Sequence, residues 1–124
     1  MGVFRDLAAI PPQQLFAGYA ARAVHGERLT LAIVEVEAEA DLPQHQHENE
    51  QLGLVIEGSL TLTVGGETRT VEPGGTWCIP GSTPHRAAGG PEGAIVLDVF
   101  APVRADWREI DEGEPTKPRW PRLR

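Results

Sequence analysis

The sequence has a single cysteine and no long apolar segment. With Cys78 alone, an internal disulfide and a zinc site built from cysteines are both excluded. No apolar run approaches the roughly 18 residues that a membrane-spanning helix needs. Arg5 and Asp6 stand where a secretion signal would carry its apolar core. We therefore expect a cytoplasmic protein without a membrane partner.

Basic residues are also scarce. Lys and Arg number 11 against 18 Asp and Glu, which gives a net charge of −7. An excess of negative charge disfavours phosphate backbones and anionic lipid headgroups as partners. The basic residues near the C-terminus are mixed with acidic ones, which is typical of a solvated tail rather than a nucleic-acid arm. We expect no nucleic-acid partner.

Glycine and proline are abundant, and patterns of long helices are missing. The chain has 14 Gly and 11 Pro, which are costly inside helices and favour short strands joined by turns. Gly65-Gly66 between two alternating runs predicts a hairpin. Residues 84–91 are predicted as a loop. Residues alternate with period two in the segments 29–38, where the phase slips once, and 59–64. The segments 52–56, 67–71, 76–79 and 94–100 are also predicted as strands.

These short strands predict an all-β sandwich or barrel in a single domain. We divide the chain into a partly extended N-terminal segment at 1–28, a barrel at 29–108 and a flexible tail at 109–124. Trp107 and Trp120 are candidates to attach parts of this tail to the barrel or to a second subunit. The alternative is that Trp120 is exposed on a free end.

Three of the four histidines, with one glutamine, form a candidate metal site. His45 and His47 are two residues apart, so an extended strand would place both rings on one face, together with Gln51. His85 follows a turn and could lie opposite them in a closed sheet. Three imidazole nitrogens and an amide oxygen suit one divalent transition metal such as Zn, Ni, Mn or Fe. The alternative is that these are unrelated surface histidines.

The last predicted strand carries polar residues that suggest chemistry. Asp98 shares a face with Phe100, and a buried carboxylate there needs a partner or a use. Asp98 is a candidate general base, Arg104 a candidate clamp for a substrate carboxylate, and Phe100 an apolar wall. The alternative is a structural Asp98–Arg104 ion pair beside an ordinary core Phe100. Cys78 is predicted as an interior or interface residue, and Trp77 as a core or subunit contact.

Two motifs in this sequence resemble those of the cupin superfamily. His45, His47, Gln51 and the following Gly58 resemble its first motif. Gly74, Pro80 and His85 resemble the second motif of the family. The resemblance implies a double-stranded β-helix, or jelly-roll barrel, with a metal inside, and a homodimer. The sequence departs from the usual pattern at three positions. Gln51 replaces a glutamate, the glycine that follows the proline of the second motif comes one residue early, at Gly81, and Gly89 stands where asparagine is common.

The segment from Asp98 to Trp107 reads Asp-x-Phe-x-Pro-x-Arg-x-Asp-Trp, and it resembles the corresponding segment in one group of cupins. These are the cupins of pectin and alginate degradation, which convert 4,5-unsaturated monouronates to linear keto-uronates. The resemblance implies metal ligation by three His and Gln51. It also implies proton transfer by Asp98, carboxylate binding by Arg104 and a functional Phe100.

Three functions compete at this point. The first is a metal-dependent isomerase or lyase acting on a small acidic sugar or keto acid. The second is a metal-dependent dioxygenase, and the third is a non-catalytic cupin that binds a small ligand. A neutral Gln51 leaves the full charge on a divalent metal, which favours Lewis-acid chemistry over redox chemistry and therefore the first.

Overall fold

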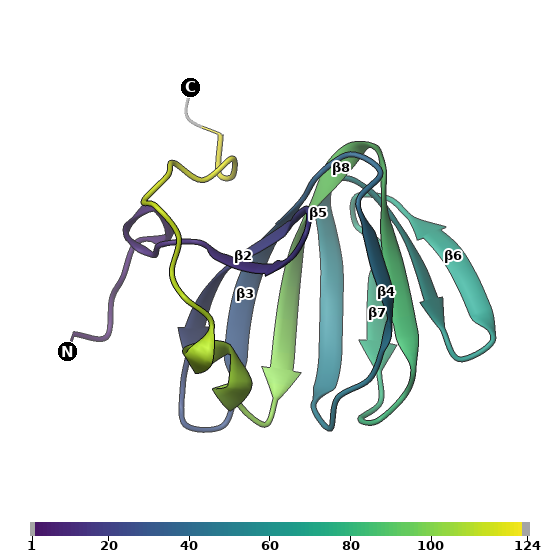
Figure 1. Ribbon diagram of the computed structural model, residues 1–124, viewed down its shortest axis with the longest axis horizontal. Helices are drawn as coiled ribbons and strands as arrows, with labels where there is room; N and C mark the ends of the chain where they lie inside the picture. Colours follow the sequence, from purple (N-terminus) through teal and green to yellow (C-terminus); the bar gives the residue numbers. More distant parts are fainter. Residues whose placement is uncertain (1, 123–124) are drawn as a thin grey trace.

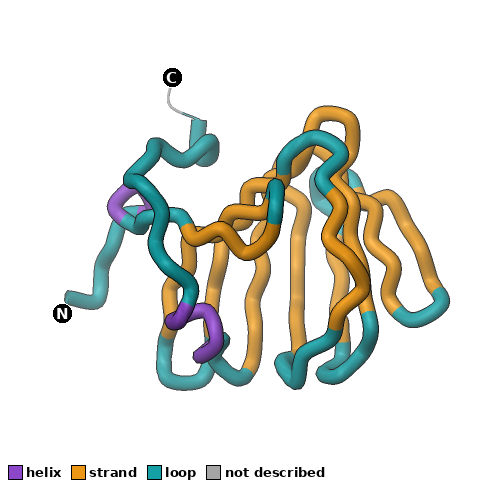
Figure 2. The backbone as a smooth tube through the Cα atoms, viewed as in Figure 1, coloured by secondary structure: helices purple, strands orange, loops and turns teal. Residues whose placement is uncertain are grey.

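The computed structural model describes residues 2–122, and nearly all of its regular structure is β-sheet (Figure 1). Two short 3-10 helices lie in the segments before the first strand and after the last (Figure 2). The elements in chain order are η1 (Leu7–Ala9), β1 (Gln13–Phe16), β2 (Tyr19–His25), β3 (Thr30–Val36), β4 (Asp41–His45), β5 (Glu50–Val64), β6 (Glu67–Val71), β7 (Thr76–Ile79), β8 (His85–Ala101) and η2 (Ala105–Glu109).

The two long strands, β5 and β8, build the jelly roll because each belongs to both halves of one continuous antiparallel sheet. In one half, residues 94–101 of β8 lie between β3 and the start of β5, and β7 pairs with that same part of β5. In the other half, residues 85–89 of β8 lie between β4 and the end of β5, which continues to β6. Inward side chains from both halves share one hydrophobic core. The predicted all-β jelly roll is confirmed.

Two glycines let the long strands cross closely where they bend. Gly58 has φ +74°, and a Cβ at this position would overlap the carbonyl oxygen of Gly93. The register between β5 and β8 shifts on both sides of this crossing. Only a residue without a side chain lets both backbones approach this way.

The predicted hairpin is present. Val64 pairs with Glu67, so that Gly65 and Gly66 form the connection. Hydroxyl groups on the two strands bond across the hairpin, with 2.9 Å between Oγ1 atoms in both Thr61–Thr70 and Thr63–Thr68. β6 and β7 have the predicted bounds, whereas segments 52–56 and 59–64 are one bulged strand, β5.

The prediction of a loop over residues 84–91 is wrong, because β8 begins at His85. The sequence there, Ala-Ala-Gly-Gly, has no alternation to mark a strand. Its small residues serve close packing instead: a Cβ at Gly89 would overlap the carbonyl oxygen of Glu37, and one at Gly90 would overlap Ser59. Cys78, predicted in the interior or at an interface, is exposed in this chain.

The sheet also begins before the predicted boundary at residue 29. β1 and β2 pair with each other, and β2 pairs with β3, so both belong to the same sheet as the rest of the barrel. Both strands lie in the segment 1–28 that was predicted to be partly extended, and β2 contains the buried Arg22.

The described part of the tail, up to residue 122, is held against the N-terminal segment and β2. Gly113 N donates to Pro12 O, and Arg22 Nη2 donates to both the carbonyl oxygen (2.7 Å) and the hydroxyl (2.8 Å) of Thr116. Arg22 also pairs with Glu35 at 2.9 Å. These contacts tie Gly113 and Thr116, in the segment predicted as a flexible tail, to the rest of the fold; residues 123–124 lie outside the described residues. Over residues 2–122 the structure has no helix long and apolar enough to cross a membrane.

Candidate metal centre and its cavity

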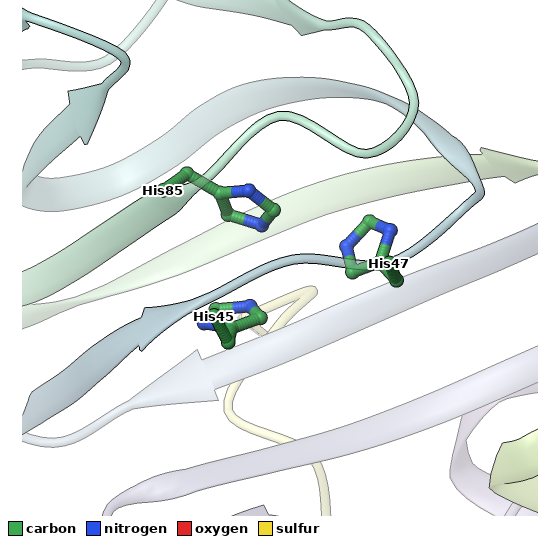
Figure 3. A group of neighbouring side chains, drawn as sticks. All are labelled: His45, His47 and His85. Carbon is green, nitrogen blue, oxygen red and sulfur yellow. The ribbon is translucent and has the colours of Figure 1, made fainter.

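The three predicted histidine ligands meet inside the jelly roll (Figure 3). His85 begins β8 and pairs with His45, the last residue of β4, while His47 lies in the loop before β5. The strand therefore ends between the two neighbouring histidines, and the loop turns His47 toward the others. The ring centroids are 4.3 Å apart for His45–His85 and 5.0 Å for His47–His85. One nitrogen from each ring lies within 4.8 Å of the others.

Backbone carbonyls determine which nitrogen each ring presents. The Nδ1 atoms of His45, His47 and His85 lie 2.9, 3.0 and 2.7 Å from the carbonyl oxygens of Pro43, Asn49 and Thr83. A carbonyl oxygen only accepts, so each Nδ1 carries the proton and each Nε2 keeps its lone pair. The Nε2 of His85 is buried, with no hydrogen-bond partner among the described residues. Three lone pairs held toward one point fit a metal ion.

Burial keeps two of these rings neutral. Loss of solvation lowers the pKa of His47, and the positive charge of Arg104 lowers it further. Burial is also the main reason why the pKa of His85 is lowered. Neutral imidazole is the form that ligates a metal, so this environment favours metal binding at neutral pH.

Gln51, at the start of β5, links His47 to Asp98. Its Oε1 lies 3.2 Å from His47 Nε2, and its Nε2 donates to Asp98 Oδ1 over 3.0 Å. Because His47 carries its proton on Nδ1, its Nε2 atom is an acceptor, and it faces a second acceptor, Oε1 of Gln51. A cation shared by the two atoms stabilises this arrangement. The amide oxygen of Gln51 is thus placed to join the three histidines.

Asp98 lies on the inner face of β8, as the alternation predicts, and is 7% exposed. Burial raises its pKa to about 6, while hydrogen bonding from Gln51 acts in the opposite direction. The alternative Asp98–Arg104 ion pair does not form: Arg104 pairs with Asp106 instead, through Nε–Oδ1 at 3.1 Å and Nη2–Oδ2 at 3.0 Å. Asp98 therefore remains a buried carboxyl group with one oxygen bonded to Gln51.

Arg104 packs against two aromatic rings at the cavity wall, Phe100 and Trp107, which also contact each other with centroids 5.0 Å apart. Its Cζ lies 4.7 Å from the ring centroid of Phe100 and 4.6 Å from that of Trp107. Such stacking orients a guanidinium group and partly desolvates it. Phe100 is also 5.8 Å from His47, centroid to centroid, so it separates the metal centre from the arginine.

All the predicted site residues line one cavity of about 400 Å³. The sequence prediction missed Trp77 and Asp106 as parts of its wall. Asp106 was visible in the sequence but had no assigned role. Trp77 was predicted as a core or subunit contact, and only the register of β7 and β8 with β5 places it near Asp98. Asn49 was also missed; its buried amide donates to Pro102 O at 2.6 Å and ties the His47 loop to the segment before Arg104.

The jelly roll and the three-histidine centre define a β-barrel protein with an internal site suited to a metal. Residues 32–100 match the family model described as "Cupin domain", and the chain belongs to this cupin family. A search of curated proteins finds no match.

Solved structures agree with this fold. KdgF from Halomonas sp. is 29% identical, with a TM-score of 0.78 over 86% of this chain and 98% of that one. An RmlC-like cupin from Shewanella frigidimarina is 22% identical, with a TM-score of 0.79 over 86% and 96% of the two chains. A variant of Bacillus subtilis oxalate decarboxylase is 24% identical, with a TM-score of 0.70; the alignment covers 82% of this chain but only 31% of that one.

Proposed function

We propose that this cupin is a metal-dependent isomerase that opens the ring of a 4,5-unsaturated monouronate or a closely similar acidic sugar. The observation that carries the proposal is the placing of Asp98, Arg104 and the three histidines around one cavity. The likeness to KdgF, a cupin of the unsaturated-monouronate class, supports it over nearly the whole of both chains. We infer that the natural substrate is a small acid and that His45, His47, Gln51 and His85 hold one divalent metal.

Each side chain has a task that its surroundings permit. Arg104 binds the substrate carboxylate with N–H groups that Asp106 leaves free, and the flat faces of Phe100 and Trp107 keep the guanidinium in place. Phe100 presents an apolar edge to the sugar ring. A metal bound by the histidines would polarise sugar oxygens as a Lewis acid.

Asp98 moves the proton. Its Oδ1 is bonded to Gln51, so Oδ2 is the oxygen that reacts. Ring opening of the unsaturated uronate removes the proton of the hydroxyl on C1, breaks the bond from C1 to the ring oxygen and leaves an aldehyde and an enolate, whose negative charge is on the former ring oxygen and C4. Asp98 takes that hydroxyl proton and returns it to C4, which turns the enolate into a ketone. No atom is gained or lost, and a carboxyl group with a pKa of about 6 can hold or release a proton near neutral pH.

Two measurements test the proposal. Elemental mass spectrometry on dialysed protein should find one divalent metal per chain, and Zn, Ni or Mn fits the proposed Lewis-acid role better than Fe. The metal-loaded protein should then accelerate loss of the ultraviolet absorbance of the conjugated C4–C5 double bond. His85→Ala is the matched control, because it removes one ligand and leaves Asp98 and Arg104 in place. Turnover by His85→Ala at the wild-type rate, or oxygen consumption instead of isomerisation, would overturn the proposal.

A further inference from the structure

Trp77 reaches the interior of the site because a glycine lies beside it. Gly53 on β5 pairs with Trp77 on β7 and, on its other side, with Asp98 on β8. A Cβ at residue 53 would overlap three atoms of the indole, Cε2, Nε1 and Cζ2. The indole therefore lies across the backbone of Gly53 and extends toward the Asp98 side of the cavity, which Trp77 and Asp98 both line.

The indole N–H of Trp77 is buried and has no acceptor at hydrogen-bond distance, although it lies close enough to the Asp98 carboxyl group to help lower the pKa of that group. Across the described residues 2–122, the buried side-chain nitrogen and oxygen atoms without a hydrogen-bond partner are Trp77 Nε1 and His85 Nε2. Both belong to residues that line this one cavity. Buried polar groups are rarely left unpaired, and each exception calls for an explanation. A metal ion explains the lone pair of His85, which leaves the N–H of Trp77 to be explained.

Neighbouring charges restrict what this donor can recognise. An indole N–H only donates, so its partner must be an acceptor. Next to it lies the carboxyl group of Asp98, which when ionised repels a ligand carboxylate and accepts hydrogen bonds. A hydroxyl group can accept from Trp77 and donate to Asp98 at the same time, whereas an ether, a carbonyl or a carboxylate can do only the first.

We propose that the Trp77 indole N–H and the Asp98 carboxylate together recognise one hydroxyl group of the ligand, which makes Trp77 a specificity-determining residue of the cavity. The proposal rests on the proposed function in taking the ligand to be a hydroxylated sugar acid. It assigns a different ligand group to each part of the cavity. Arg104 binds the ligand carboxylate, and the Trp77–Asp98 pair binds a ligand hydroxyl group. Gly53 is required because any side chain there would displace the indole.

Nuclear magnetic resonance of the indole groups tests this directly. The chain has three tryptophans, so ¹⁵N-tryptophan labelling gives one indole signal for each of Trp77, Trp107 and Trp120. Trp77→Phe assigns the first, and Trp107→Phe with Trp120→Phe assigns it by elimination if Trp77→Phe does not fold. Zinc-loaded protein is titrated with three probes: glucuronate, the neutral sugar xylose, and tetrahydropyran-2-carboxylate, an acid without hydroxyl groups.

We expect glucuronate to move the Trp77 indole proton downfield and tetrahydropyran-2-carboxylate to leave it in place. Calorimetry should show glucuronate binding about tenfold more weakly to Trp77→Phe, the size of effect expected for one lost hydrogen bond, with the deoxy acid unaffected. If xylose moves the Trp77 signal and neither acid binds, the hydroxyl recognition stands and the acidic substrate of the proposed function fails.

Two results would overturn the inference. One is a Trp77 signal that no hydroxylated probe moves. The other is a Trp77 signal that Asp98→Asn shifts in the ligand-free protein and that ligands leave unchanged, which would make the indole a permanent structural donor to Asp98.

Discussion

Gln51 and Asp98 form a hydrogen bond of 3.0 Å from the amide Nε2 to the carboxylate Oδ1. Because Asp98 accepts this bond, the amide group is oriented with Oε1 toward His47 Nε2. The residue proposed to move protons thus also orients a candidate metal ligand. Substitutions at either residue should affect both metal affinity and turnover, whereas substitutions at Arg104 should affect turnover alone.

Metal affinity should depend unequally on the four candidate ligands. His85→Ala removes a buried imidazole whose Nε2 has no other partner, and we expect zinc affinity to fall about 100-fold or more. Gln51→Ala removes a neutral amide and should cost about 10-fold, the scale of effects seen around metal sites. Gln51→Glu adds a negative charge and should tighten binding. Competition with a chelator measures all three, and equal losses for His85→Ala and Gln51→Ala would contradict the prediction.

The carboxyl group of Asp98 should make stability depend on pH. Its pKa rises from 3.8 to about 6 on folding, so the folded state binds the proton more tightly than the unfolded chain. This favourable contribution is fully present below pH 3.8 and is lost as pH rises through about 6. At about 1.4 kcal/mol per pKa unit, the loss is about 3 kcal/mol.

The measurement is the free energy of unfolding of metal-free wild type and Asp98→Asn, each at several pH values from 4 to 7. His47 and His85 titrate in both proteins, so their contribution largely cancels in the difference. Wild type should lose stability relative to Asp98→Asn as pH rises, and a constant difference would show that Asp98 keeps an ordinary pKa.

Substitutions of Arg104 and Asp106 should change the KM for an acidic substrate in opposite directions. Arg104→Ala removes a charge-assisted bond to the substrate carboxylate and should raise KM about 10- to 100-fold, with zinc affinity unchanged. In Asp106→Asn the guanidinium stays packed against Phe100 and Trp107 but loses a competing carboxylate. Because that ion pair is largely solvent-exposed on the Asp106 side, KM should fall by no more than about fivefold. A higher KM for Asp106→Asn would mean that Asp106 mainly positions Arg104.

Buried Arg22 of β2 should stabilise the fold through its contacts with the tail and with neighbouring strands. Arg22 is 3% exposed and bonds to Ile10 O, Glu35 and Thr116. Arg22→Ala removes the donors to Ile10 O and Thr116 and leaves Glu35 only its contacts with Arg119, and it should cost about 3–5 kcal/mol, as breaking a buried ion pair does. Arg119→Ala is the matched control, since exposed Arg119 contacts the same Glu35 at 3.5 Å and should cost at most about 1 kcal/mol. Thermal unfolding of the two variants checks the difference.

The residues of the site were predictable because their spacing and alternation are local. The two-residue step from His45 to His47 and the inward face of Asp98 can both be seen in the sequence, although the single extended strand expected for His45, His47 and Gln51 is wrong, because β4 ends at His45 and a loop carries His47. The carbonyl partners of the histidines depend on loop conformations that no spacing specifies. The partner of Arg104 could not be chosen from residue types, because Asp98 and Asp106 offer the same carboxylate. Only the fold shows that Asp98 is inside the barrel and Asp106 is at its rim.

The fold was predictable where short extended segments are bounded by glycine turns and hidden where small residues pack. β6 and β7 lie between such turns, while the start of β8 is a run of Ala and Gly that makes a strand only beside Glu37 and Ser59. Arg22 and Thr116 are 94 residues apart, so nothing local could predict their contact. The homodimer and the small acidic ligand stay predictions.

Three imidazoles that already offer Nε2 toward one point have a chromatographic consequence. Nickel resin retains tagged proteins through this same kind of donor, and nickel ions released from the resin would meet these three imidazoles inside the barrel. An oligohistidine tag would compete with the barrel for whatever ion is present. The metal in such a preparation would record the resin, whereas protein isolated by ion exchange, for which its charge of −7 is suited, would keep the ion that it acquired in the cell.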